Sequence, residues 1–509
     1  MGSCEYTQVF ADAGIGVVGY DKNTWKPLLR QTIICVGVCC AYFMLGISMG
    51  APTVILAQIR KDVNSTEIVT DEMLLWLTSS VTISSVPFVI LLPLLSNRTG
   101  RKQTFLFVWL SSFIGFIIFY TSTKLYYIIL SEVFVSVTYA SAITITPLLV
   151  AEYTSPKYRG IFLSLKSASV FWGIWVSNAI GTFFPWKNIA IVPLVCSVYM
   201  ISMFLWPESP YWLAMKGRYV ECAKTHRWLK GVNENSEKEL AQLIISQKVS
   251  RNSPLPSSNS IYYYVRNIWP VVKSRPFYKP VLLSIILFLQ YQYTGKLVIS
   301  LYAIDVLKRL TQDESFVYIE MLILDGVTVF SMYVGCVLSR YYKRRTLLLL
   351  FAVTGISLLY LLSLYTYLVS LSILNENHFI ILILLTTFSI SIGCGPIILP
   401  TTIFGEIIPI RYERVALIFV GLASCTTLSL LLTLSPYMFT AWKMHGSFLF
   451  FAISSTIFLT VIYIYLPETK DKTIQEIEEY FSETKQSVKS NINTTRKLIA
   501  NESVQCSTT

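Results

Sequence analysis

Two ionisable residues, Lys296 and Asp325, lie inside apolar stretches that are long enough to cross a membrane. A charge near the centre of a bilayer costs several kcal/mol unless it has a partner, so such residues commonly mark functional sites. A buried pair of this kind is suited to the selection of a polar or acidic solute. Alternatively, each side chain reaches water at a membrane surface along its own stem. The same two alternatives stand for Lys166 in an earlier apolar stretch.

The sequence contains no residue pattern typical of an enzyme. It has three histidines and lacks a Gly-rich nucleotide loop, a nucleophile elbow and any cluster with the spacing of metal ligands. Most of the ten cysteines lie in apolar stretches, where cysteine behaves as a small hydrophobic residue. We therefore expect no catalytic activity, no cofactor and no metal.

The composition is that of a membrane protein that crosses the bilayer many times. Of the 509 residues, 54% are hydrophobic and 14% are charged. The net charge of +12 matches the Lys and Arg excess of cytoplasmic loops beside anionic lipid, and we expect no nucleic acid partner. The expected partners are a small-molecule solute and membrane lipid, and the oligomeric state is left open.

The apolar stretches predict an all-α membrane protein with twelve transmembrane helices in two six-helix bundles. A polar interval with helical spacing over 218–229 and 236–250 separates the bundles. The predicted parts are a cytoplasmic N-terminal tail (1–30), the first bundle (31–206), a cytoplasmic helical linker (207–280), the second bundle (281–466) and a cytoplasmic C-terminal tail (467–509).

The predicted helices have approximate bounds that follow from the apolar runs. In the first bundle they cover 32–56, 73–95, 104–121 and 126–150, then a stretch ending near 184, and 188–206. In the second bundle they cover 281–303, 317–338, 346–370, 379–404, 415–434 and 446–466.

Three loop patterns occur in the same order in both bundles. Internal repeats of this kind imply two bundles that rock about a site between them. The corresponding stretches are 97–102 and 343–345, 152–159 and 406–414, and 207–209 and 467–469.

Four of these motifs together resemble the sugar porter family of the major facilitator superfamily. They follow helices 2, 4, 6 and 12, and the similarity runs from Gln31 to Lys470. Within the family, Gly46–Pro52 and Gly405–Pro409 most resemble the insect facilitated trehalose transporter-like group. The resemblance implies a facilitative transmembrane carrier of a glucose- or trehalose-like sugar that works by alternating access.

The resemblance also implies a sugar site between helices 5, 7, 8, 10 and 11. Most of the amides and indoles that line this site in the family are replaced here by small hydroxyl or thiol side chains. A sugar hydroxyl that loses its partner costs about 1 to 3 kcal/mol, so a standard glucose site is not expected. The candidate substrate-binding residues are Ser167, Gln292, Thr294, Lys296, Asp325, Thr328, Ser391 and Thr401.

Charged residues at the helix ends on one side form a candidate gate. We expect Glu152 to pair with Arg159, and Arg98 and Arg101 to pair with acids of adjacent helix ends. Pairs that exist in one state only bias the exchange between states; alternatively, the cations serve only to orient the helices. The candidate gating residues are Arg98, Arg101, Glu152, Arg159, Arg344, Glu406 and Arg414.

Three positions of the gate and coupling machinery differ in charge from the family. Glu132 and Glu413 stand where the family carries Arg, so the gate of the second half is expected to be weaker. Ser48 stands where proton-coupled members carry Asp. With no carboxylate at that position, the sequence favours facilitated diffusion over symport.

The distribution of Lys and Arg predicts the orientation in the membrane. These residues are more frequent in the loops after helices 2, 4, 8 and 10, which places those loops and both termini in the cytoplasm. The glycosylation motif at Asn64 then lies outside, and together with the family it favours the plasma membrane.

Two alternatives to a sugar carrier are left open by the altered site. One is a nutrient sensor or receptor that keeps the transporter fold without transport, which suits the altered site and the long polar tail. The other is a carrier of a non-sugar polar or anionic solute, which suits Lys296 and Asp325.

Overall fold

The computed structural model describes residues 10, 15–16, 25–61, 71–252, 272–311, 316–408, 413–470 and 480–481. Asn64 and most of both predicted tails lie outside these residues. All regular secondary structure in the described residues is helical. Eleven helices among them are long and apolar enough to cross a membrane.

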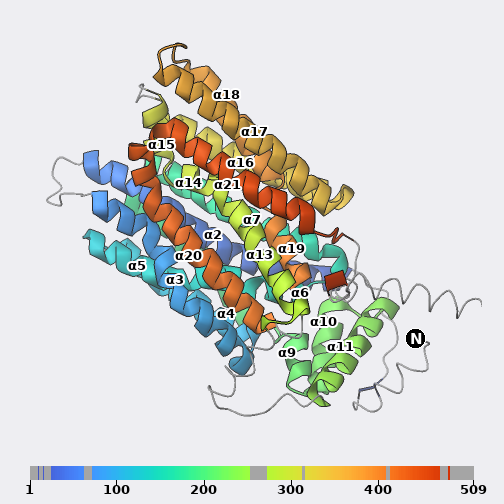
Figure 1. Cartoon of the computed structure of the whole chain (residues 1–509). Helices are drawn as coiled ribbons and strands as arrows, with labels where there is room; N and C mark the ends of the chain where they lie inside the picture. The colour runs from blue at the N-terminus through green and yellow to red at the C-terminus, as the bar shows by residue number, and fades with distance from the viewer. Residues whose placement is uncertain are drawn as a thin grey trace, which may run out of the picture.

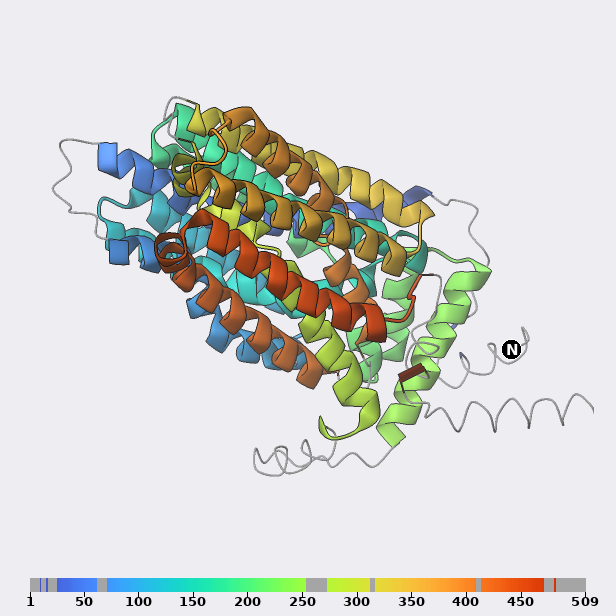
Figure 2. The ribbon, with the colours of Figure 1, turned by 45° about the horizontal axis from the view of Figure 1, so that its top comes forward.

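The helices form two halves and a linker, as Figures 1 and 2 show. The first half contains α2 (Trp25–Lys61), α3 (Asp71–Thr99), α4 (Arg101–Thr121), α5 (Leu125–Ile143), α6 (Ile145–Tyr153), α7 (Pro156–Phe183), η1 (Trp186–Ala190), α8 (Ile191–Met200) and η2 (Ile201–Leu205). The linker contains α9 (Pro210–Met215), α10 (Tyr219–Lys230) and α11 (Glu234–Asn252).

The second half follows the linker and repeats the pattern of long helices. It contains α13 (Arg275–Tyr293), α14 (Lys296–Leu301), α15 (Ala303–Leu310), α16 (Val317–Tyr341), α17 (Arg344–Ser370), α18 (His378–Cys394), α19 (Leu399–Ile407), α20 (Glu413–Ala441) and α21 (Lys443–Tyr465). The halves meet along two helix pairs, α3 with α20 and α7 with α16.

The predicted single helix over 281–303 is wrong, because the chain breaks between α13 and α14. Gly295 adopts φ +73°, a left-handed conformation that L side chains rarely adopt. A Cβ at this residue would also come within 2.8 Å of the Phe451 ring. The break turns the second part of this segment, α14, into a separate element. The predicted helix over 379–404 is likewise divided, into α18 and α19.

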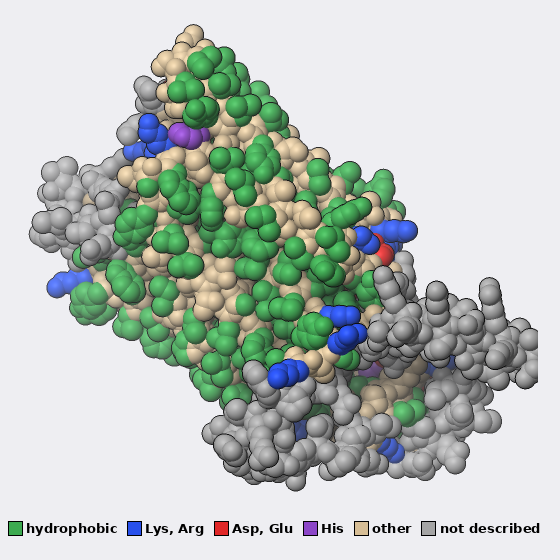
Figure 3. Space-filling model, viewed as in Figure 1, with side chains coloured by type: hydrophobic (Ala, Val, Ile, Leu, Met, Phe, Trp, Pro, Cys, Tyr) green, Lys and Arg blue, Asp and Glu red, His purple; other side chains and the backbone are tan. Residues whose placement is uncertain are grey.

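The lateral surface of the helices is apolar. Figure 3 shows hydrophobic side chains over this face, with Lys and Arg gathered toward its two ends. Such a surface contacts lipid acyl chains without loss of hydrogen bonds. This surface and the apolar helices identify a multi-pass membrane protein.

The repeated motifs at 207–209 and 467–469 have the same structural role in the two halves. Glu208 accepts the backbone N–H of Arg101 at 2.8 Å, at the first residue of α4. Glu468 accepts the backbone N–H groups of Arg344 at 3.1 Å and Arg345 at 3.2 Å, at the start of α17. Each carboxylate therefore satisfies N–H groups that have no partner within their helix and lies at its positive end.

The linker helices form a small unit at one end of the halves. Arg227 binds Glu237 at 2.9 Å, and Lys230 binds Glu239 at 2.6 Å. Burial, together with the cations of Lys230 and Arg227, lowers the pKa of His226 well below its usual value. The imidazole is therefore neutral at physiological pH, and the two ion pairs link α10 to α11 beside an apolar core that includes Leu213 and Ile244.

Helices α2 and α7 approach each other closely at glycine residues. A Cβ at Gly46 would lie 1.9 Å from the carbonyl oxygen of Val170, and a Cβ at Gly173 would lie 2.2 Å from that of Phe43. No side chain fits there without separating the two backbones. The close packing of the first half therefore requires these glycines.

We expect Gly173→Ala to destabilise the protein by about 1 to 3 kcal/mol, because the backbone atoms opposite this residue cannot move aside independently. Gly405→Ala is the matched control, since its Cβ would meet only the Leu163 side chain, at 3.7 Å. Thermal unfolding of the purified protein in detergent measures both effects. Equal melting temperatures for the two variants would contradict the close approach.

Candidate functional site

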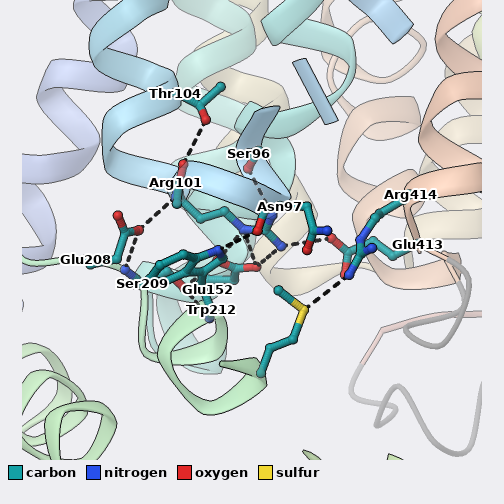
Figure 4. A network of polar contacts seen from close by, with 12 residues as sticks. Ser96, Asn97, Arg101, Thr104, Glu152, Glu208, Ser209, Trp212, Glu413 and Arg414 are labelled. Carbon is teal, nitrogen blue, oxygen red and sulfur yellow. Dashed lines mark hydrogen bonds and ion pairs between the residues drawn. The ribbon is translucent and has the colours of Figure 1, made fainter. Parts of the chain in front are cut away.

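A buried arginine connects the two halves at the end that carries the linker. Arg101 binds Glu152 through Nε at 3.2 Å and through Nη2 at 3.0 Å, and its Nη1 donates to Ser96 at 2.9 Å. Nη2 also lies 3.3 Å from Glu413 at the start of α20 in the second half. Figure 4 shows the guanidinium between the two carboxylates. The Arg101 and Glu413 side chains are only 7% and 13% exposed, so water weakens this contact little.

The sequence had suggested an ion pair between Glu152 and Arg159. The structure pairs Glu152 with Arg101. The second oxygen of Glu152 is occupied by the hydroxyl of Ser209 at 2.5 Å. Arg159 instead donates to the backbone carbonyl of Ala151 at 3.0 Å. Arg98 is exposed and makes no ion pair with any residue that the structure describes.

Among the predicted gating residues of the second half, Arg344 and Glu406 form an ion pair. This pair stays within one half, in contrast to the contact of Arg101 with Glu413. The third residue, Arg414, places Nη2 3.3 Å from the sulfur of Met215 in the linker. In the described part of the chain it forms no ion pair.

Asp325 lies at the centre of a buried polar cluster between the halves. Its Oδ2 accepts from Asn178 Nδ2 of α7 at 2.8 Å, and its Oδ1 accepts from Ser300 Oγ of α14 at 2.9 Å. Lys296 is also buried, but its ammonium is not within 4.0 Å of Asp325 or of any other acid that the structure describes. The predicted direct ion pair between Lys296 and Asp325 is therefore absent, and Asn178 and Ser300 are the hydrogen-bond partners of Asp325.

Two further predicted residues meet across the interface. Ser167 Oγ of α7 and Thr401 Oγ1 of α19 are 3.0 Å apart. Within the second half, Gln292 Nε2 donates to the carbonyl and the hydroxyl of Ser424, both at 2.9 Å. These contacts place further polar side chains in the interior of the protein.

Three other predicted residues make no side-chain contact across the interface in the part of the chain that the structure describes. Thr294 and Thr328 donate to backbone carbonyls within their own segments, those of Tyr291 at 2.7 Å and Leu324 at 2.6 Å. Ser391 contacts Thr354 of α17 at 2.5 Å, so it faces a neighbouring helix of the same half. Their hydroxyls are already paired with protein atoms.

A carboxyl group lies beside Ser48, which the sequence did not predict. Ser48 Oγ donates to Glu132 Oε2, which reaches it from α5. The two residues are fully buried and are far apart in the sequence. A carboxyl group is therefore present beside α2, supplied by the neighbouring helix.

The halves also touch at the end opposite the linker. Thr53 Oγ1 donates to the carbonyl of Leu301 at 2.6 Å. The hydroxyls of Thr78 and Tyr302 are 2.7 Å apart. Both contacts join the first half to the segment that follows the break at Gly295. Contacts between the halves thus exist at both ends of this conformation.

Sequence reasoning missed the two partners of Asp325. Asn178 stands alone as an amide in an apolar stretch, a signal that could have singled it out, whereas Ser300 resembles many other serines. Gln290 is fully buried, and neither of its amide atoms has a hydrogen-bond partner in the described residues. Such a group is an unused donor and acceptor inside the second half.

Comparison with known proteins gives consistent matches over most of the chain. Residues 31–481 match the family described as "Sugar (and other) transporter". Facilitated trehalose transporter Tret1 of Bombyx mori is 26% identical over 466 residues, which cover 89% of this chain and 86% of that protein. Facilitated trehalose transporter Tret1 of Apis mellifera ligustica is 24% identical over 479 residues, 91% of this chain and 90% of that protein.

Solved structures with the same fold include the proton:xylose symporter XylE, of the major facilitator superfamily, bound to 6-bromo-6-deoxy-D-glucose. Its TM-score is 0.72 at 14% sequence identity, and the alignment covers 89% of this chain and 99% of that chain. Because the family match extends over far more than half of the sequence, the protein belongs to the sugar transporter family and has the fold of the major facilitator superfamily.

Proposed function

We propose that the protein is a facilitative carrier that moves a sugar across the membrane by alternating access. Membership of the sugar transporter family makes it a transporter and not an enzyme. The observation that carries the proposal is the buried polar contact of Asn178 with Asp325 between the halves. A second contact between the halves, Ser167 with Thr401, lies about three helical turns away along α7. A solute held there touches both halves and is released when one end opens.

The contacts at the two ends support a gating role for each. At the linker end, Arg101 reaches Glu413 across the interface, and at the other end Thr53 reaches Leu301. For the solute to leave, one set of contacts must break while the other persists. Alternating access then consists of the exchange between these two arrangements.

A glucose- or trehalose-like solute agrees with the chemistry of the polar region. Hydroxyl groups bind best to planar carboxylates and amides and to ammonium donors, which Asp325, Asn178 and Lys296 supply. The relatives in Bombyx mori and Apis mellifera ligustica are described as facilitated trehalose transporters. We assign the solute to the region around Asp325, and not to the amide positions that are altered here.

We further propose that the linker end faces the cytoplasm of a cell whose plasma membrane holds the protein. The loops at that end carry Arg101, Arg159, Arg344 and other cations, in keeping with the usual bias of cytoplasmic loops. Both termini then lie inside, and Asn64 lies outside, where it can be glycosylated.

We expect Glu413→Gln to weaken the contact between the halves at the linker end by about 1 kcal/mol, because Arg101 keeps only its partner within the first half. The equilibrium between the closed and the open state of this end should then shift roughly fivefold. Hydrogen–deuterium exchange should rise at the starts of α4 and α20. Arg98→Gln is the matched control, since this exposed cation has no ion pair among the described residues. The same rise in both variants, or in neither, would exclude a locking role for Glu413.

We expect Asp325→Ala to lower solute uptake by at least about tenfold, because the substitution removes the acceptor that holds Asn178 and Ser300 and leaves their donors buried without partners. Ser391→Ala, which alters a hydroxyl facing α17, should stay within about twofold of the original rate. Uptake of labelled glucose, trehalose, fructose, polyols and gluconate by expressing cells measures both variants. The amount of folded protein at the surface is the control.

The same uptake assay also tests the proposed function itself. Saturable sugar uptake that is insensitive to collapse of the pH gradient is the expected result. Uptake that stops when the gradient collapses would contradict facilitated transport and direct attention to Glu132 beside Ser48. No uptake of any compound by protein at the surface would contradict a carrier and favour a sensor.

A further inference from the structure

A pocket of about 430 Å³ lies where the linker meets the end of the first half. Its walls include Leu205 and Pro207 on one side and Arg218, Lys224 and Trp228 of the linker on the other. Leu205 ends the sixth apolar segment, which covers 186–205. The pocket therefore opens at the level where the acyl chains of a membrane give way to the headgroups.

Exposed apolar side chains surround the opening of the pocket. Leu205 is 83% exposed and Trp228 is 37% exposed, and Phe204 and Val220 are exposed beside them. The Trp228 ring is held in place by Arg30, whose guanidinium lies 4.7 Å from the ring centroid and whose Nη1 donates to the Trp228 carbonyl at 2.7 Å. Tryptophan and aliphatic side chains at this level are typical contacts of the membrane interface.

The charges around the pocket leave one cation available. The carboxylate of Glu221 is bound by Arg218, and that of Glu208 accepts backbone N–H groups at the start of α4. The exposed Lys224 forms no hydrogen bond or ion pair with any residue that the structure describes. Lys102 lies nearby and donates to a backbone carbonyl at the end of the sixth segment, at 2.8 Å. The lining holds two cations, Arg218 and Lys224, and two acids, Glu208 and Glu221. Both acids are bound to other groups, which leaves the Lys224 ammonium for a ligand.

We propose that this pocket binds the headgroup of an acidic phospholipid from the adjoining leaflet. The lipid phosphate lies at Lys224, and the acyl chains follow the exposed apolar face of the sixth segment, which includes Leu205. The argument for a lipid, and not a free anion, is the continuity of the pocket around the Lys224 ammonium with an apolar lipid-facing surface. This proposal does not rest on the identity of the transported solute.

The bound lipid would tie the linker to the first half. Helix α10, which carries Lys224, packs against α2, and Gln31 of α2 donates to the Leu229 carbonyl at 3.0 Å. A headgroup between α10 and the end of the sixth segment adds a further link across the same junction. The occupied pocket would therefore fix the position of the linker, which also contacts Arg414 of the second half through Met215.

Native mass spectrometry of the full-length protein in detergent tests this site, with dioleoylphosphatidylserine and dioleoylphosphatidylcholine as probes. We expect the serine lipid to be retained preferentially, and Lys224→Gln to lower its retention by about fivefold, as expected for one lysine beside an acidic lipid. Lys224→Arg should retain the lipid. The matched control is Lys238→Gln on α11, a lysine that is paired with Glu234 at 2.7 Å.

Three outcomes would overturn the proposal. They are equal retention of both lipids, an equal loss in Lys224→Gln and Lys238→Gln, and full competition by an equal concentration of glycerophosphoserine, which lacks acyl chains. Trp228→Ala provides a second variant, and it should also weaken retention because it removes the aromatic wall. The melting temperature of each variant shows that a loss of lipid does not reflect a loss of folding.

Discussion

The interior of a membrane offers no water to a polar group, and this constraint accounts for most of the structure. Backbone groups satisfy each other within helices, and the helix ends recruit carboxylates such as Glu208 and Glu468. Side chains obey the same rule, since Asp325 receives hydrogen bonds from Asn178 and Ser300. Polar groups of the two halves therefore meet each other, and the places where they meet are the places where the halves can be held or released.

The two halves repeat the same motifs but do not form the same gate. In the first half, Arg101 holds Glu152 and extends to Glu413 of the second half. In the second half, Arg344 binds Glu406 and stays within that half. One guanidinium thus binds two carboxylates, one from each half. The cation of this contact comes from the first half and the acid that it reaches across the interface comes from the second.

The sequence predicted the helices, the two halves and the linker, because apolar length and repeated motifs are local properties. It did not predict the break at Gly295, since the apolar run continues through it, and the left-handed backbone and the approach of Phe451 that require a glycine arise only in the folded chain. The partner of Glu152 and the contact of Ser48 with Glu132 depend on helices that are distant in the sequence. The direction of each hydroxyl around the helix, as at Ser391, likewise depends on how the helices pack.

Pulsed electron spin resonance distances between the halves test alternating access most directly. One pair of spin labels, at Arg98 and Lys343, reports on the linker end, and another, at Lys124 and Trp442, reports on the opposite end. If the halves rock about the region around Asp325, saturating solute shifts the two distance distributions in opposite directions. Distributions that do not change, or that lengthen together, would contradict the account.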